Sequence, residues 1–323
     1  MADDSKQKPD SGPAIRGIHL ALWPRPGGSL EDDLALAREV GFDGVELAVT
    51  ATHAIVGGRI LPAGLKRLSS SLERFGGSVS LHAPLGLNLM DTVHAELHEA
   101  VARASLEVGR VLGARILVFH PGWLARHRLF SANQELMQWE AALLGEYAET
   151  ARNFGMAIAL ENVAPFPEEN GEDRMTYGLD PEMVAEQVRG IANPALTCCL
   201  DVSHAAISAN RRHTDPAADI RAMSPDIGHI HLHDSFAAGP GPTLENAAEA
   251  VVFGLGDCHL PLGWGRLDFA NLLNGLAVRP DTTMVLEILP DLLQAEILAE
   301  SLSLARKLAE KPLAKALDRA GGF

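Results

Sequence analysis

The chain of 323 residues is poor in cysteine, in tyrosine and in basic side chains, and it has no long apolar run. Its three cysteines show neither disulfide nor zinc-finger spacing, so we expect a protein of a reducing compartment, the cytoplasm. Lysine and arginine number 27 against 42 acidic residues, and the net charge of −15 disfavours a surface for nucleic acid or anionic membrane. No apolar stretch reaches the length that crosses a bilayer.

The chain is rich in apolar residues, at 47%, and in glycine, at 30 residues, which suits a compact α/β protein. Residues 1–14 are polar and lack the apolar core of a signal peptide, so we expect a disordered N-terminal tail. Residues 15–323 then form a single domain, a length that one α/β barrel can use.

Short apolar runs alternate with helical patterns throughout that domain. Strands are expected at residues 15–22, 44–48, 78–82, 115–120, 157–162, 196–201, 227–233 and 283–287. Helices are expected at residues 30–40, 62–75, 92–112, 131–154, 181–191 and 216–223, from 269–276, and over about 291–320. This alternation predicts a parallel sheet with right-handed crossovers, closed into a (β/α)8 barrel. A doubly wound open sheet is the alternative, but no Gly-x-Gly-x-x-Gly follows the first strand.

The fifth expected strand is apolar until it ends abruptly in Glu161 and Asn162. A carboxylate at the end of a buried strand needs something that compensates its charge. The same pattern recurs at the tips of other strands, which carry His82, His120, Asp201, His204, His231 and Glu287. In a barrel these tips meet at one mouth, where crowded carboxylates stay ionised only beside cations. Histidine and carboxylate donors without thiolate favour a divalent ion of zinc, manganese, iron or cobalt.

Residue spacing adds two further candidate ligands and distinguishes among the three histidines of the seventh expected strand. Asp257 and His259 are two residues apart, so in an extended chain they share a face. His229, His231 and His233 also share a face, and they cannot all bind one ion. We favour His231 and assign His229 to the barrel interior as a hydrogen-bonded histidine. Taken singly, each candidate is more often a satisfied polar group, and their recurrence at one end of successive strands supports the set.

Loops near these tips supply possible substrate contacts. Trp23 and Trp123 follow the first and fourth strands and either wall a ligand pocket or pack their own loops. We expect Asn162 to contact substrate beside Glu161. Residues 236–255 form an insertion in which residues 247–253 could fold as a short helix over the mouth, as a lid or an oligomer contact.

The strand tips resemble the xylose-isomerase-like TIM-barrel superfamily, which contains sugar phosphate isomerases, sugar epimerases and the endonuclease-IV-type nucleases that cut at abasic sites. The similarity runs from Ile15 to about Leu304. It is carried by Leu81-His82-Ala83-Pro84, Phe119-His120-Pro121-Gly122, Leu160-Glu161-Asn162, Leu200-Asp201-Val202-Ser203-His204, His231-Leu232-His233-Asp234, Asp257-Cys258-His259 and Leu286-Glu287. Each motif is weak alone, and their order on these strands makes the combination specific.

The resemblance implies a set of metal ligands. Glu161, Asp201, His231 and Glu287 match the four ligands of the single-metal epimerases. The additional ligands of the three-zinc nucleases are matched by His82, His120, His204, Asp257 and His259, so the chain looks able to hold one to three ions. The loop after the third strand lacks the aromatic residue that those nucleases use on DNA, and basic residues are sparse near the strand ends. We therefore expect a small-molecule substrate and no nucleic acid.

Two mechanisms are compatible with this site. In an isomerase or epimerase of a small sugar or sugar derivative, one metal would polarise a carbonyl, Glu161 and Glu287 would move the proton, and His204 would orient a substrate oxygen. In a multi-metal hydrolase or lyase, with phosphoester cleavage as the clearest case, Glu161 would bridge two ions. The large ligand set fits the second mechanism slightly better, because an epimerase needs only one ion. We favour a carbohydrate substrate and the first mechanism; a binding protein without catalysis is disfavoured because no ligand position is lost.

Overall fold

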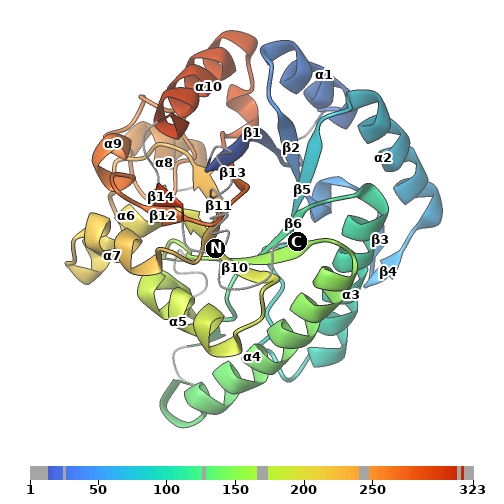
Figure 1. Cartoon of the computed structure of the whole chain (residues 1–323), viewed down its shortest axis with the longest axis vertical. Coiled ribbons are helices and arrows are strands. Elements are labelled where there is room, and N and C mark those ends of the chain that lie inside the picture. The colour runs from blue at the N-terminus through green and yellow to red at the C-terminus, as the bar shows by residue number, and fades with distance from the viewer. Residues whose placement is uncertain are drawn as a thin grey trace, which may run out of the picture.

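The computed structural model describes residues 14–24, 27–125, 129–165, 174–239, 247–310 and 314–315. Eight parallel strands close into a barrel, and helices surround it (Figure 1). The strands succeed one another around the barrel in chain order: β1 (Ile15–Leu22), β2 (Gly44–Ala48), β5 (Ser78–His82), β6 (Ile116–Phe119), β8 (Ala157–Glu161), β10 (Leu196–Asp201), β11 (Ile227–Leu232) and β13 (Thr282–Leu286). The expected (β/α)8 barrel is confirmed.

The helices begin and end at signals that the sequence carries. Ser29 caps the first helix by accepting a hydrogen bond from the N–H of Asp32, and Gly41 ends it in the left-handed conformation, with φ of 94°. The helices are α1 (Leu30–Val40), α2 (Pro62–Phe75), α3 (Ala95–Leu112), α4 (Leu129–Asn153), α5 (Pro181–Ile191), α6 (Val202–Arg212), α7 (Pro216–Met223), α8 (Ala247–Phe253), α9 (Phe269–Leu272) and α10 (Ala295–Ala309).

The core has two compartments that follow from the period of two along each strand. One large cluster of buried apolar side chains lies between the strands and the surrounding helices, with Leu20, Leu81 and Leu160 among its members. A separate small cluster consists of Val118, Ala159 and Cys199, which alternate with those wall-facing positions along their strands and so face the barrel interior. The interior is therefore filled by side chains up to the level at which the polar strand tips begin.

The last helix is shorter than the sequence suggested. We expected a helix over about 291–320, and α10 ends at Ala309. A separate 3-10 turn, η4 (Pro290–Leu292), precedes it, and a short strand, β14 (Ala314–Lys315), pairs in parallel with β12 (Ala277–Val278). Pro312 lies between the helix and that strand in the sequence, and proline disfavours helical backbone in the residue before it.

Other boundaries differ for local reasons. Helix α3 begins at Ala95 and not at residue 92, because the carboxylate of Asp91 accepts hydrogen bonds from the N–H groups of Val93 and His94 in a turn before it. Helix α9 covers Phe269–Leu272 and stops short of residue 276. Short two-stranded pairs were not foreseen: β3 (Ile55–Val56) with β4 (Arg59–Ile60), and β7 (Leu124–Ala125) with β9 (Arg174–Met175).

The insertion at residues 236–255 contains α8 over residues 247–253, as the sequence predicted. Val252 and Phe253 at its end are exposed, at 82% and 63%. Its role as a lid or an oligomer contact stays a prediction. The predicted tail at residues 1–14 falls outside the described residues except for its last position. None of the helices in the described part of the chain combines the length and the apolar character that a bilayer span requires.

Candidate metal centre

The parallel direction of the strands brings their carboxyl ends to one face of the barrel. Glu161 ends β8, Asp201 ends β10, His231 lies near the end of β11, and Glu287 directly follows β13. Asp201 is the register partner of His231, so these two side chains start from the same level. All four are at most 2% exposed. Their polar groups are therefore buried at the carboxyl ends of the strands.

Glu161 is the centre of a ring of imidazoles. Its Oε2 lies 3.2 Å from Nε2 of His82 and 3.3 Å from Nε2 of His120. Its Oε1 lies 3.2 Å from Nδ1 of His204 and 3.4 Å from Nδ1 of His231. Each carboxylate oxygen therefore faces histidines from two different elements of the barrel. A bridging role between two cations is compatible with this arrangement.

A second group of donors surrounds Asp257. Its Oδ2 lies 3.2 Å from Nε2 of His204 and 2.9 Å from Nε2 of His259, and its Oδ1 lies 3.6 Å from Nε2 of His233. These four residues offer donor atoms that all lie within 4.8 Å of one another. Asp257 and His259 have side chains that are 32% and 24% exposed, so this group is closer to solvent than Glu161, at 1%. The two groups share His204.

The orientation of three histidine rings is set by the main chain. In His82, Nδ1 lies 2.8 Å from the carbonyl oxygen of Ala83. In His204, Nδ1 lies 3.0 Å from the carbonyl oxygen of Asn162, and in His259 it lies 3.2 Å from the carbonyl oxygen of Glu287. A carbonyl only accepts, so each Nδ1 carries a proton and donates to the main chain, while each Nε2 is directed at a carboxylate of the cluster. Ligand histidines of metal sites are held in this way.

Among the residues that the structure describes, both ring nitrogens of His231, Oε1 of Glu46 and Oε1 of Glu287 are buried and lack a hydrogen-bond partner. Two of these atoms, Nδ1 of His231 and Oε1 of Glu287, lie 3.5 Å apart. An unpaired buried polar atom is costly, and a divalent cation would satisfy both of these atoms at once. The donor set therefore fits a hard or borderline divalent ion with mixed histidine and carboxylate ligands.

Charge compensation inside the cluster shows how strongly its members interact. Burial acts to raise the pKa of Glu161, but the neighbouring histidines, His231 foremost, outweigh it and hold that pKa well below its usual range. Burial acts to lower the pKa of His204, and the surrounding carboxylates raise it well above its usual range. Burial also acts to lower the pKa of His259, but Asp257 outweighs it and raises that pKa to about 9. Imidazolium protons thus supply positive charge that a cation would replace, and metal binding releases protons.

Sequence reasoning missed two polar residues that contact this site. His233 is buried, and its Nε2 lies 3.0 Å from Oδ2 of Asp201. Glu46 of β2 is 1% exposed and contacts both His229 and His231. The signal for His233 was its shared face with His231. The signal for Glu46 is a lone carboxylate inside an apolar strand, the same pattern that marks Glu161.

The proposed substrate contacts have different surroundings. Both ends of the Asn162 amide are occupied by the main chain of Asp201, because Nδ2 donates to its carbonyl oxygen and Oδ1 accepts from its N–H, each at 2.9 Å. Asn162 therefore positions Asp201, and its contact with substrate stays a prediction. The ring of Trp23 lies 5.1 Å from the ring of His82, and Arg174 lies over the ring of Trp123 at 4.5 Å. Both tryptophans are partly exposed near the strand ends.

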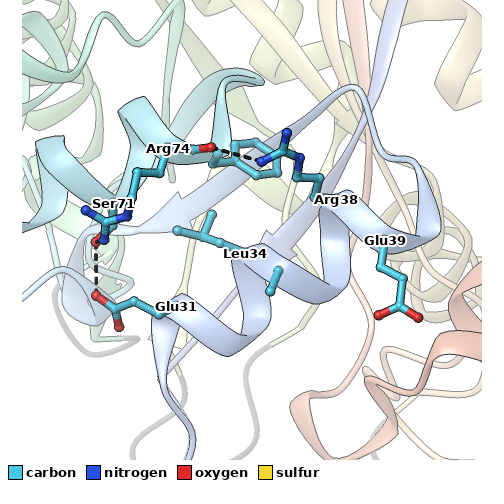
Figure 2. A pocket seen from close by; sticks show the side chains of 8 residues that line it. Glu31, Leu34, Arg38, Glu39, Ser71 and Arg74 are labelled. Atoms are coloured by element: carbon cyan, nitrogen blue, oxygen red, sulfur yellow. Dashed lines mark hydrogen bonds between the residues drawn. The ribbon is translucent and has the colours of Figure 1, made fainter.

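Two surface cavities lie beside α1. One, of about 490 Å³, lies between α1 and α2 on the outer wall, where Glu31 accepts a hydrogen bond from Ser71 at 3.0 Å (Figure 2). Its lining includes none of the candidate ligands. The other, of about 560 Å³, is lined by Trp23, Thr52, His53 and Arg67 among others, from the loops after β1 and β2 and from α2. That cavity is on the side of the barrel where the strand tips lie.

Comparison with known proteins shows a family match over most of the chain. The sequence model of a family described as xylose isomerase-like TIM barrel matches residues 34–308. An uncharacterized protein of Methanocaldococcus jannaschii is 27% identical over 260 residues, which are 77% of this chain and 75% of that protein.

Three solved structures share the fold across nearly the whole chain. A D-tagatose 3-epimerase-like protein is 22% identical, with a TM-score of 0.64, over 90% of this chain and 98% of the other. A protein of Thermus thermophilus that was soaked with ZnCl2 is 24% identical, with a TM-score of 0.60, over 90% and 98%. A D-psicose 3-epimerase in the presence of D-fructose is 13% identical, with a TM-score of 0.62, over 91% and 99%. At these identities the likeness shows the fold.

Proposed function

Because this chain belongs to the xylose isomerase-like TIM barrel family, we propose that it is a divalent-metal-dependent isomerase or epimerase of a small sugar or sugar derivative. The observation that carries this proposal is the pair of unpartnered buried atoms, Nδ1 of His231 and Oε1 of Glu287, beside the carboxylate of Glu161 in the described part of the chain. Two of the similar solved structures have sugar 3-epimerase in their names, which supports a sugar as the substrate class.

The cation would be held by Glu161, Asp201, His231 and Glu287. When bound, it would supply a positive charge beside adjacent carbonyl and hydroxyl oxygens of the sugar, which polarises the carbonyl and acidifies the neighbouring C–H. Glu161 and Glu287 flank Nδ1 of His231, at 3.4 Å and 3.5 Å. We assign the proton transfer to these two carboxylates: one accepts the proton from carbon, and the other returns a proton to the substrate.

Other side chains of the mouth would orient the sugar. His204 has Nδ1 held by the carbonyl oxygen of Asn162 and Nε2 directed at Asp257, so its ring position is set from both sides. We propose that His204 orients a substrate oxygen. Trp23, packed on His82 and lining the 560 Å³ cavity, and Trp123, covered by Arg174, would form apolar walls for the sugar ring.

A second candidate function is favoured by the group around Asp257. His204, His233, Asp257 and His259 bring further donors within 4.8 Å of one another, more than a single-metal epimerase uses. With several ions bound, the chain would act as a multi-metal hydrolase or lyase, with phosphoester cleavage on a small substrate as the clearest reaction. The net charge of −15 disfavours nucleic acid as that substrate.

Metal stoichiometry and a substrate screen on the same preparation distinguish the two functions. The protein is purified without chelators, analysed for metals, and reconstituted with Mn²⁺, Co²⁺ or Zn²⁺. The isomerase or epimerase predicts interconversion of ketoses or their derivatives with about one essential ion per chain. About three ions per chain, together with phosphoester hydrolysis and no sugar interconversion, would establish the second function instead.

A further inference from the structure

One layer below the strand tips, the buried carboxylate of Glu46 contacts two histidines of β11, His229 and His231. Oε2 of Glu46 lies 2.7 Å from Nε2 of His229, and Oε1 lies 2.9 Å from Nε2 of His231. All three residues are at most 1% exposed.

Both ring nitrogens of His231 face carboxylates, and neither has full hydrogen-bond geometry among the described residues. Nε2 lies 2.9 Å from Oε1 of Glu46, whereas Nδ1 lies 3.4 Å and 3.5 Å from Glu161 and Glu287, the carboxylates of the proposed metal site. The shortest contact is therefore the one with Glu46. A neutral imidazole offers a lone pair on one nitrogen only when the other nitrogen carries the proton. We infer that Glu46 is the positioning residue of this site: it keeps the proton of His231 on Nε2 and thereby presents the lone pair of Nδ1 to the bound cation. The inference rests on the proposed metal site of the preceding section.

His229 acts on Glu46 and not on the cation. Its Nε2 is engaged by Oε2 of Glu46, and its Nδ1 is buried and lacks a hydrogen-bond partner among the described residues. This differs from His82, His204 and His259, which each hold Nδ1 on a carbonyl oxygen and direct Nε2 at a carboxylate of the site. The hydrogen bond with His229 fixes the plane of the Glu46 carboxylate, so that Oε1 stays directed at His231.

The same three residues could in principle form a cation site of their own, since their donors also lie within 4.8 Å of one another. A cation there would need the lone pair on Nε2 of His231. The proton would then move to Nδ1, between Glu161 and Glu287, and His231 would be lost from the upper site. The two arrangements are exclusive, and they predict opposite tautomers of His231.

The tautomer is measured directly by nitrogen NMR on protein with ¹⁵N-labelled histidine and bound Zn²⁺, with the His231 signals assigned by their loss in His231→Gln. The expected result is a proton on Nε2 and none on Nδ1. A proton on Nδ1 would overturn the proposal. This measurement needs no variant of Glu46 to fold, and it does not depend on turnover, so failure of the sugar chemistry would leave it interpretable.

Glu46→Gln tests the same role through affinity. Removing the charge that faces Nε2 of His231 is expected to weaken Zn²⁺ binding by about tenfold to a hundredfold, measured by competition with a chromophoric chelator. The matched control is His19→Gln, which removes another buried polar contact of the barrel interior, to Ser78 and Ser80, without touching a ligand. His19→Gln is expected to keep the wild-type affinity. Equal losses in both variants, or no loss in Glu46→Gln, would contradict the proposal.

Discussion

Oε2 of Glu161 lies 3.2 Å from Nε2 of His82, and neither side chain is more than 3% exposed. Because this carboxylate also faces three other imidazoles, it is the residue on which the whole cluster depends. Glu161→Gln keeps the shape and removes the charge. We expect it to abolish turnover under either candidate mechanism and to lower the bound metal, measured by elemental analysis. An active variant with unchanged metal content would remove Glu161 from the site.

Asp257 is expected to hold the weaker of the bound ions. It lies between His204 and His259, and its side chain is about one third exposed, whereas the site of Glu161 has three carboxylates and is buried. Asp257→Asn should therefore remove the low-affinity step from a Zn²⁺ titration and keep the high-affinity step. Cys258→Ser is the control, because Sγ of Cys258 contacts the carbonyl oxygens of Ala250 and Leu255 and not the ligands. Identical titrations for Asp257→Asn and wild type would contradict this assignment.

Glu140 of α4 should make the stability of the protein depend on pH. Burial raises the pKa of Glu140 to about 7, and its carboxylate accepts hydrogen bonds from the N–H of Gly122 and the hydroxyl of Tyr177. A raised pKa means that the folded state binds the proton more tightly than the unfolded state. Proton binding by Glu140 therefore adds about 3 kcal/mol to the free energy of unfolding. This contribution is complete below a pH of about 4.5 and is lost as the pH rises through about 7.

The measurement compares the free energy of unfolding of wild type and Glu140→Gln across this pH range. The difference between the two proteins should shift by up to about 3 kcal/mol in favour of the variant as the pH rises from about 5 to about 8. Glu135→Gln, an exposed position on the same helix, should leave the wild-type pH dependence unchanged. A constant difference between Glu140→Gln and wild type would mean that Glu140 is ionised throughout.

Gly44 at the start of β2 is required for steric reasons. A Cβ at this position would collide with Nε2 of His19 and with the main-chain carbonyl oxygen and hydroxyl of Ser78. Gly44→Ala is therefore expected to lower the free energy of unfolding by about 1–3 kcal/mol. Gly190→Ala in α5 is the control, since its Cβ would meet nothing within 4 Å, and it should raise the free energy of unfolding by up to about 1 kcal/mol. Denaturant unfolding of both variants measures the contrast.

Much of the barrel could be predicted because its signals are local. Strands β1, β2, β5 and β10 and helices α1, α2, α5, α7 and α8 begin and end where the sequence predicted. Apolar runs, capping residues such as Ser29 and helix-ending glycines such as Gly41 act over a few neighbouring residues. The end of α10 differs, because the prediction continued the helix past Pro312 to about residue 320.

The candidate site was predictable only in part. The strand-tip residues stood out because polar groups ended apolar runs, and the parallel topology brought them together. Glu46 and His233 were passed over, because their role depends on which side chain of another strand they contact. The hydrogen bonds of the Asn162 amide with the main chain of Asp201 were likewise not foreseen, because they depend on the neighbouring strand β10.

The sequence by itself determined the order of strands and helices and the identity of the side chains at the strand tips, because both are written in consecutive residues. Only the tertiary structure decided what each imidazole contacts. The proton on a neutral histidine ring goes to the nitrogen that meets an acceptor, and the carboxylate that faces Nε2 of His231 is Glu46, on a strand far away in the chain. Closure of the barrel brings that carboxylate beneath the site. We infer that this contact sets the direction in which His231 presents its lone pair.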